Sequence, residues 1–146
     1  MRGAFLLISL ALLSNPAAAQ KASDYVRDCE TASDKPFCES SRKQFNAWFP
    51  KALKGDYQGQ RNVAFCLMTG CDEAVNPDWI TGCAWRMVLK AGRDRRYDAG
   101  DKMNFDVDCG AERVDTSERA DAARIAQALF RRIYKRELPL DALSRP

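Results

Sequence analysis

Six cysteines carry the most specific chemistry in this 146-residue sequence. They are Cys29, Cys38, Cys66, Cys71, Cys83 and Cys109. An even number of cysteines in an exported chain indicates disulfides. The sequence favours one pairing, Cys29 with Cys38, because a single turn separates two short expected helices there. Cys66, Cys71 and Cys83 could instead be thiolate ligands of a metal, which we consider the weaker interpretation in an oxidising compartment.

Other kinds of site have less support. The chain has no histidine, which excludes Ser-His-Asp and Cys-His catalysis and every histidine-ligated zinc site. Four aspartates in one polar segment could hold calcium: Asp98, Asp101, Asp106 and Asp108. Because the EF-hand spacing of glycine and glutamate is missing, we favour helix capping in a solvated loop. Gly55 and Gly59 lack the continuation of a phosphate-binding loop. We therefore expect no cofactor and no metal.

Cations and tryptophans supply candidate partner contacts. The basic clusters are Arg93, Arg95 and Arg96, and then Arg131, Arg132, Lys135 and Arg136. Either cluster could meet phospholipid or an acidic protein surface, although a plain solvated face is the favoured interpretation. Trp79, near an expected helix start, is the best contact candidate among the tryptophans. The formal net charge of +3 is too small for a nucleic-acid-binding protein.

The first 19 residues have the features of a secretory signal peptide. Arg2 precedes an apolar run from Ala4 to Leu13, and small residues at 17–19 offer a cleavage site. The run is about 10 residues long, too short to span a bilayer that needs roughly 20. We expect a periplasmic or secreted protein with no transmembrane segment in its mature chain. Residues 20–140 should form one domain, and residues 141–146 a tail.

Apolar residues recur at spacings of three and four, and no long segment alternates, so the expected fold is all-α. Ser23 should cap a short first helix that holds Tyr25, Val26 and Cys29. Asp34 and Pro36 should open a second helix that ends at Pro50. The expected inner side of this second helix consists of Phe37, Ser41, Phe45, Trp48 and Phe49.

A helical hairpin is expected next. Asp56 should cap a helix that ends at Gly70, with Val63, Cys66 and Leu67 on its inner face. Asn76 should cap a further helix that begins at Pro77 and ends at Gly92. Two helices joined by about seven residues should lie antiparallel.

The C-terminal third is expected to contain a polar loop and one long helix. The loop could include a short helix after Asp101. Asp115 and Glu118 have the spacing of a capping box, which predicts a helix over residues 115–137, stopped by Pro139. Its apolar stripe consists of Ala122, Ile125, Ala126, Leu129, Phe130 and Ile133.

Residues 52–92 also match the positions of a known repeat. The matching positions are Gly55-Asp56, Gly59-Gln60, Val63-Ala64, Gly70, Asp78-Trp79 and Gly82 to Trp85. This segment resembles one Sel-one-like repeat, a helical hairpin of the tetratricopeptide-related class. It departs from the family pattern at Val63, Ala64 and Gly82, in a longer loop that holds Cys71, and in having a single clear copy.

The resemblance implies a hairpin in which the small residues Ala64 and Gly82 let two backbones approach while Trp85 covers the gap. Gly55 and Gly70 bound its first helix. Because stacked repeats normally need several copies to bury a core, a single copy needs flanking helices and disulfides as caps. The expected architecture is a small disulfide-tied helical array with N-terminal helices and a C-terminal capping helix around the hairpin.

The family implies work through protein contacts, with no catalytic residues to carry over. We therefore expect an exported interaction or adaptor module of bacterial origin that binds a protein partner and is not an enzyme. The alternative is a small exported enzyme, or an enzyme inhibitor, that uses a cleft lined by Asp and Arg between the hairpin and the last helix. A purely structural exported protein is a third possibility, because fold does not fix function.

Overall fold

Helices account for the whole regular structure of the described chain. The fold is given by a computed structural model in which residues 20–143 are described. The expected signal peptide, residues 1–19, and the last three residues of the expected tail lie outside this range. Within it, the β structure is limited to one isolated antiparallel bridge between Val26 and Val75. The expected all-α class is confirmed.

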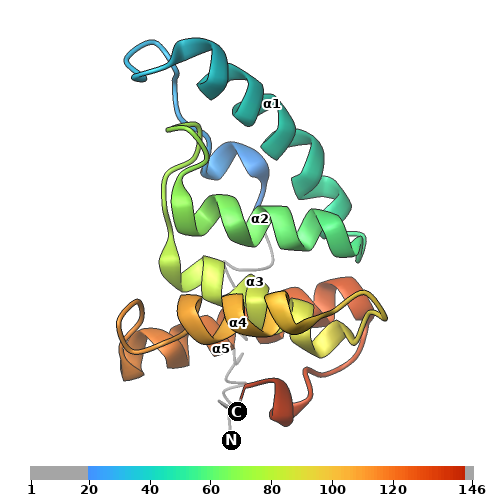
Figure 1. Ribbon diagram of the computed structural model, residues 1–146. Helices are drawn as coiled ribbons and strands as arrows, with labels where there is room; N and C mark the ends of the chain where they lie inside the picture. Colours follow the sequence, from blue (N-terminus) through green and yellow to red (C-terminus); the bar gives the residue numbers. More distant parts are fainter. Residues whose placement is uncertain (1–19, 144–146) are drawn as a thin grey trace, which may run out of the picture.

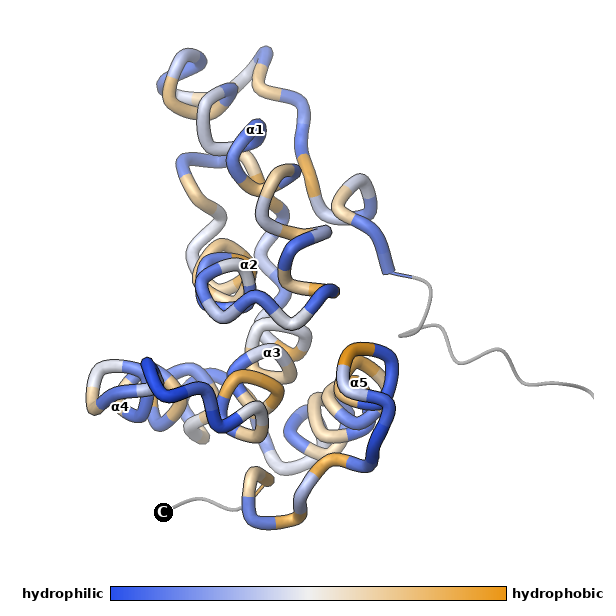
Figure 2. The backbone as a smooth tube through the Cα atoms, turned by 90° about the vertical axis from the view of Figure 1, so that its right-hand side faces the viewer, coloured by the Kyte–Doolittle hydropathy of each residue, from blue (hydrophilic) through white to orange (hydrophobic). Residues whose placement is uncertain are grey.

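Five α-helices and two short 3-10 turns follow one another along the described chain. In order they are η2 (Ala22–Asp24), α1 (Lys35–Ala52), α2 (Tyr57–Thr69), α3 (Trp79–Gly92), α4 (Ala99–Asp108), α5 (Thr116–Tyr134) and η3 (Leu140–Ala142). α3 lies at the centre and packs against α2, α4 and α5, while α1 packs on the far side of α2 (Figures 1 and 2).

The prediction of a first helix that holds Tyr25, Val26 and Cys29 is wrong. Only the turn Ala22–Asp24 forms, and its N-cap is Lys21 rather than Ser23. The backbone beyond it pairs with the loop between α2 and α3: the Arg27 amide donates to the Ala74 carbonyl at 2.9 Å, and the Asn76 amide donates to the Tyr25 carbonyl at 2.8 Å. These long-range bonds replace the local ones that a helix would make.

α1 begins as expected and ends later. The Asp34 side chain accepts a hydrogen bond from the Phe37 amide, and Pro36 lies in the first turn. The helix continues through Pro50 to Ala52 because burial of Phe49 and Ala52 holds its last turn on the core. Phe37 was expected on the inner side, but the residue is 64% exposed, so that placement is wrong.

α2 agrees with its predicted bounds, and α3 begins later than predicted. Asp56 caps α2, and Gly70 ends it with a positive φ of 84°. The N-cap of α3 is Asp78 rather than Asn76, and the helix begins at Trp79 rather than Pro77. The cause is the pairing of Asn76 with Tyr25, which keeps this part of the loop extended.

The two C-terminal helices also differ from expectation. α4 begins at Ala99, two residues before Asp101, because Asp98 and Asp101 form a capping box. α5 has the predicted box of Asp115 and Glu118 but ends at Tyr134, short of the predicted 137. Lys135 takes a positive φ of 56°, and this turn lets Leu138 fold back into the core.

The close approach of α3 to α2 at Gly82 is present. A Cβ at Gly82 would lie 2.4 Å from the Sδ of Met68 and 3.5 Å from the Cβ of Leu67. Ala64 and Trp85 are both fully buried beside this contact. Trp85 also packs edge-on against Phe49, with ring centroids 6.0 Å apart, which joins α3 to α1.

All six cysteines form disulfides. Cys29 pairs with Cys38, as the sequence favoured, and ties the N-terminal segment to α1. The other pairs are Cys66 with Cys71, at the end of α2, and Cys83 with Cys109, which joins α3 to the end of α4. Metal ligation by Cys66, Cys71 and Cys83 is therefore wrong. Among the described helices, none has the length and apolar character that crossing a membrane requires.

Candidate functional site

The expected partner-contact residues do not form one open basic patch. Arg93 pairs with Asp141 at 3.0 Å, and Arg96 pairs with Asp94 at 2.9 Å. Arg95 is exposed. Trp79 is partly exposed at the start of α3, where the guanidinium of Arg113 lies 5.2 Å from its ring centroid.

The four aspartates of the polar segment serve helix capping and ion pairing. Asp98 caps α4, and Asp101 completes the capping box. Asp106 pairs with Lys102 on the same helix at 3.0 Å. Asp108 accepts a hydrogen bond from Nε of Arg86 at 2.7 Å. The favoured interpretation of helix capping thus holds for the first two aspartates.

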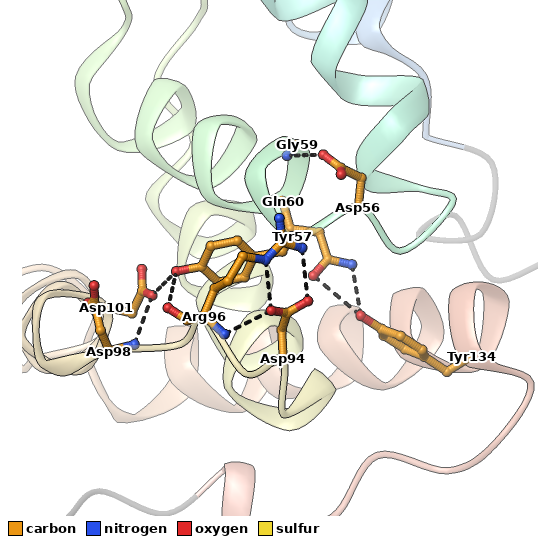
Figure 3. A network of polar contacts seen from close by, with 9 residues as sticks. All are labelled: Asp56, Tyr57, Gly59, Gln60, Asp94, Arg96, Asp98, Asp101 and Tyr134. Atoms are coloured by element: carbon orange, nitrogen blue, oxygen red, sulfur yellow. Dashed lines mark hydrogen bonds and ion pairs between the residues drawn. The ribbon is translucent and has the colours of Figure 1, made fainter.

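Asp101 also belongs to a polar network in which Tyr57 links it to the loop before α4 (Figure 3). The Tyr57 hydroxyl donates to the Asp101 carboxylate, and the same hydroxyl oxygen lies 2.9 Å from the Arg96 carbonyl. Burial and the neighbouring Asp101 raise the pKa of Tyr57 to about 12. Hydrogen bonds from Arg96 lower the pKa of Asp94 to about 2. This network fixes the loop before α4 onto the start of α2.

A groove of about 650 Å³ lies between α1 and α2. It is lined by Phe37, Ser40, Ser41, Gln44, Trp48, Asn62, Phe65, Thr69, Cys71 and Asp72. Phe65 is 53% exposed, Phe37 is exposed more fully, and Trp48 is half-buried. The groove therefore has aromatic walls and an uncharged polar rim, apart from Asp72.

The helices place these aromatic rings by their caps and by covalent ties. Phe37 lies in the first turn of α1, which Asp34 caps and the Cys29–Cys38 disulfide anchors. Phe65 lies on the outward face of α2, opposite the buried Val63. At one end, the Ser41 hydroxyl donates to Oδ2 of Asp72 at 2.6 Å, which ties α1 to the loop after α2.

A smaller hollow of about 380 Å³ adjoins the groove on the other side of Phe65. Its lining residues are Gln58, Arg61, Asn62, Phe65, Arg86 and Asn104. Asn62 and Phe65 line both spaces, so the two are neighbours across the outward face of α2. We call this hollow the arginine pocket.

Two carboxylates, buried Asp101 and largely buried Asp108, hold the arginines of the arginine pocket in place. Arg86 is only 3% exposed, and its Nε donates to Asp108. Nε of Arg61 lies 3.1 Å from Oδ1 of Asp101. Arg86 comes from α3, Arg61 from α2 and the two aspartates from α4, so the pocket exists only where three helices meet.

Sequence reasoning predicted neither space as a site, although it named Phe37, Ser41 and Trp48 as the inner side of a helix. Two signals were available. Phe65 is an aromatic residue outside the apolar stripe of α2, and Arg86 is a cation inside the apolar run of α3. Both signals are weak, because an exposed aromatic residue and a buried arginine depend on neighbours from other helices.

Comparisons with protein-family models, with curated proteins and with solved structures give no match for this chain. The candidate site therefore has to be interpreted from its own geometry.

Proposed function

We propose that this protein is an exported interaction module without catalytic activity, which binds an amphipathic helical segment of a partner protein in the groove between α1 and α2. The observation that carries the proposal is the pair of exposed rings, Phe37 and Phe65, on the two walls of an open groove with half-buried Trp48. Exposed apolar side chains that gather around a groove are typical of docking sites. The expected Sel-one-like hairpin is compatible with such a role and remains a prediction.

The chemistry of the groove favours a helical peptide. An amphipathic helix presents apolar side chains at i, i+3, i+4 and i+7, which matches aromatic walls on two facing helices. The serine, glutamine, asparagine and threonine side chains of the rim can bond to polar groups that flank such a stripe. The two arginines beside the groove suit a partner with an acidic residue near its apolar face. Three disulfides fit a protein of an oxidising compartment.

The test is peptide selection on the purified protein with its disulfides intact. Random peptides of about 16 residues, roughly 24 Å long as a helix, are displayed, selected and then measured in solution by fluorescence anisotropy. We expect Phe65→Ser to lower the affinity for the selected peptides by about tenfold or more, because buried aromatic anchors dominate such interfaces.

Val107→Ser is the matched control, since Val107 on α4 is 54% exposed, about the same as Phe65. It should leave the affinity unchanged. Failure to select any peptide, or equal losses in the two variants, would contradict the proposed function.

A further inference from the structure

Arg86 has hydrogen-bonding capacity that the protein does not use. Among the described residues, only its Nε–H has an acceptor, the Asp108 carboxylate. The Nη1 atom of Arg86 is buried and has no hydrogen-bond partner among residues 20–143. A buried charged donor without an acceptor is costly, and native proteins seldom keep one without a reason. Arg86 lines the arginine pocket, so a ligand there could supply the acceptor after a small side-chain adjustment.

Two further donors line the same space. Apart from its ion pair with Asp101, Arg61 makes no hydrogen bond to a described residue, and it is partly exposed toward solvent. The side-chain amide of Asn104, on α4, also has no partner in the described chain and can donate. Guanidinium groups present planar forks of N–H donors, which match the two oxygens of a carboxylate.

The charge balance decides which anion fits. Asp101 and Asp108 each neutralise one arginine, so the pocket has directed donors without a large net positive charge. A singly charged anion therefore fits this site better than a doubly charged phosphate group does. The Phe65 ring beside the donors can contact the carbon chain that carries the charge.

We infer that the arginine pocket binds a carboxylate of the peptide that occupies the groove, from an Asp or Glu side chain or from a chain end. This inference rests on the proposed function, because the groove and the pocket share Asn62 and Phe65 and one ligand can span both. The groove supplies apolar contact area, and the pocket selects an acidic group next to it.

The first experiment tests the pocket without a peptide. Benzoate and its neutral analogue benzamide are each titrated into isotope-labelled protein and followed by NMR. We expect benzoate to shift the side-chain signals of Arg61, Arg86 and Asn104, and benzamide to shift them little. Equal responses to the two compounds, or no response at these residues, would overturn the carboxylate site.

The second experiment changes the ligand, which cannot affect folding of the protein. In each selected peptide, every Asp and Glu is replaced in turn by Asn or Gln, and separately the C-terminus is amidated. Loss of one carboxylate should weaken binding by about tenfold, the effect expected for a charge-assisted hydrogen bond. Loss of affinity on replacing an Asp or Glu identifies a side-chain carboxylate, and loss on amidation identifies the C-terminal carboxylate.

A protein variant completes the cycle. Asn104→Leu should lower the affinity for the acidic peptide several-fold and leave the affinity for its neutral analogue unchanged. Asn46→Leu, on the exposed face of α1, is the control variant. Replacing Arg86 is less informative, because it would leave Asp108 unpaired.

If peptides bind through Phe65 but ignore every carboxylate change, the inference fails and the proposed function stands. If benzoate binds while no peptide does, the proposed function fails and the carboxylate site stands.

Discussion

At the scale of single residues, Arg86 is the side chain that joins the fold to the candidate site. It lies in the most apolar helix, where every described neighbour from Thr81 to Leu89 is buried. A cation is tolerated there because Asp108 from α4 accepts its Nε–H at 2.7 Å. The same contact holds α4 against α3 close to the Cys83–Cys109 disulfide.

Arg86→Leu should lower the free energy of unfolding by about 3 kcal/mol, because it leaves the largely buried Asp108 carboxylate without its partner. The double variant Arg86→Leu, Asp108→Leu should recover most of this loss, since an apolar pair has no charge to bury. Urea unfolding followed by circular dichroism at neutral pH measures both effects.

Arg124→Leu is the control for this prediction. Arg124 pairs with Asp121 on the surface of α5, and 76% of its side chain is exposed. Exposed ion pairs contribute about 0–1 kcal/mol, so this variant should be nearly neutral. A loss for Arg86→Leu as small as that for Arg124→Leu would show that the Arg86 pair does not stabilise α4.

At the scale of the elements, one residue type begins each of the five described α-helices. The N-caps are Asp34, Asp56, Asp78, Asp98 and Asp115. Each carboxylate accepts a hydrogen bond from the backbone amide three residues later, at 2.7 to 3.2 Å. A negative charge at this end also favours the helix dipole. The repeated cap explains why so few helix starts depend on long-range contacts.

Two glycines set how closely the helices approach. A Cβ at Gly59 would lie 2.8 Å from the backbone nitrogen of Ala52 and 3.1 Å from the carbonyl oxygen of Trp48. At Gly82 the nearest atoms belong to the flexible side chain of Met68. We therefore expect Gly59→Ala to cost about 3 kcal/mol and Gly82→Ala about 1 kcal/mol, since alanine's helix propensity offsets part of the overpacking.

Thermal and urea unfolding of the two variants give the comparison, with Ala47→Gly on the exposed face of α1 as a measure of helix propensity alone. If Gly82→Ala proved the more damaging variant, the packing of Met68 between α2 and α3 would be more rigid than we argue.

At the scale of the whole molecule, three tyrosines from separate parts of the chain share one electrostatic property. Burial is the first cause that raises the pKa of Tyr25, Tyr57 and Tyr97 to about 12, and nearby aspartates add to it. Their ordinary value is 10.0, so in the unfolded chain they ionise at a lower pH than in the folded protein. The fold thus stabilises the neutral phenols.

The sign of the pH dependence follows from this difference. The stabilisation is fully present below pH 10 and should be lost as the pH rises from 10 to about 12. Urea midpoints measured across this range should fall steeply, and the ultraviolet absorbance of phenolate should report when the tyrosines ionise. Tyr57→Phe should make the fall shallower. Ionisation of all tyrosines near pH 10 while the protein stays folded would contradict the prediction.

The sequence alone determined the features that depend on neighbours along the chain. The all-α class, the N-caps Asp34, Asp56 and Asp115, and the glycine end of α2 all follow from contacts within three or four residues. The Cys29–Cys38 pair belongs with them, because the sequence favoured it from the single turn expected between the two cysteines. Spacing and residue type carry this local information.

Only the tertiary structure decided what depends on distant partners. The bridge between Val26 and Val75 removed an expected helix and delayed the start of α3. The arrangement of α1, α2, α3 and α4 leaves the Phe37 and Phe65 rings exposed. It also brings three side chains together in one pocket: Arg61, Arg86 and Asn104. Burial and ion pairing between helices are sums over the whole fold, and no short window of sequence contains them.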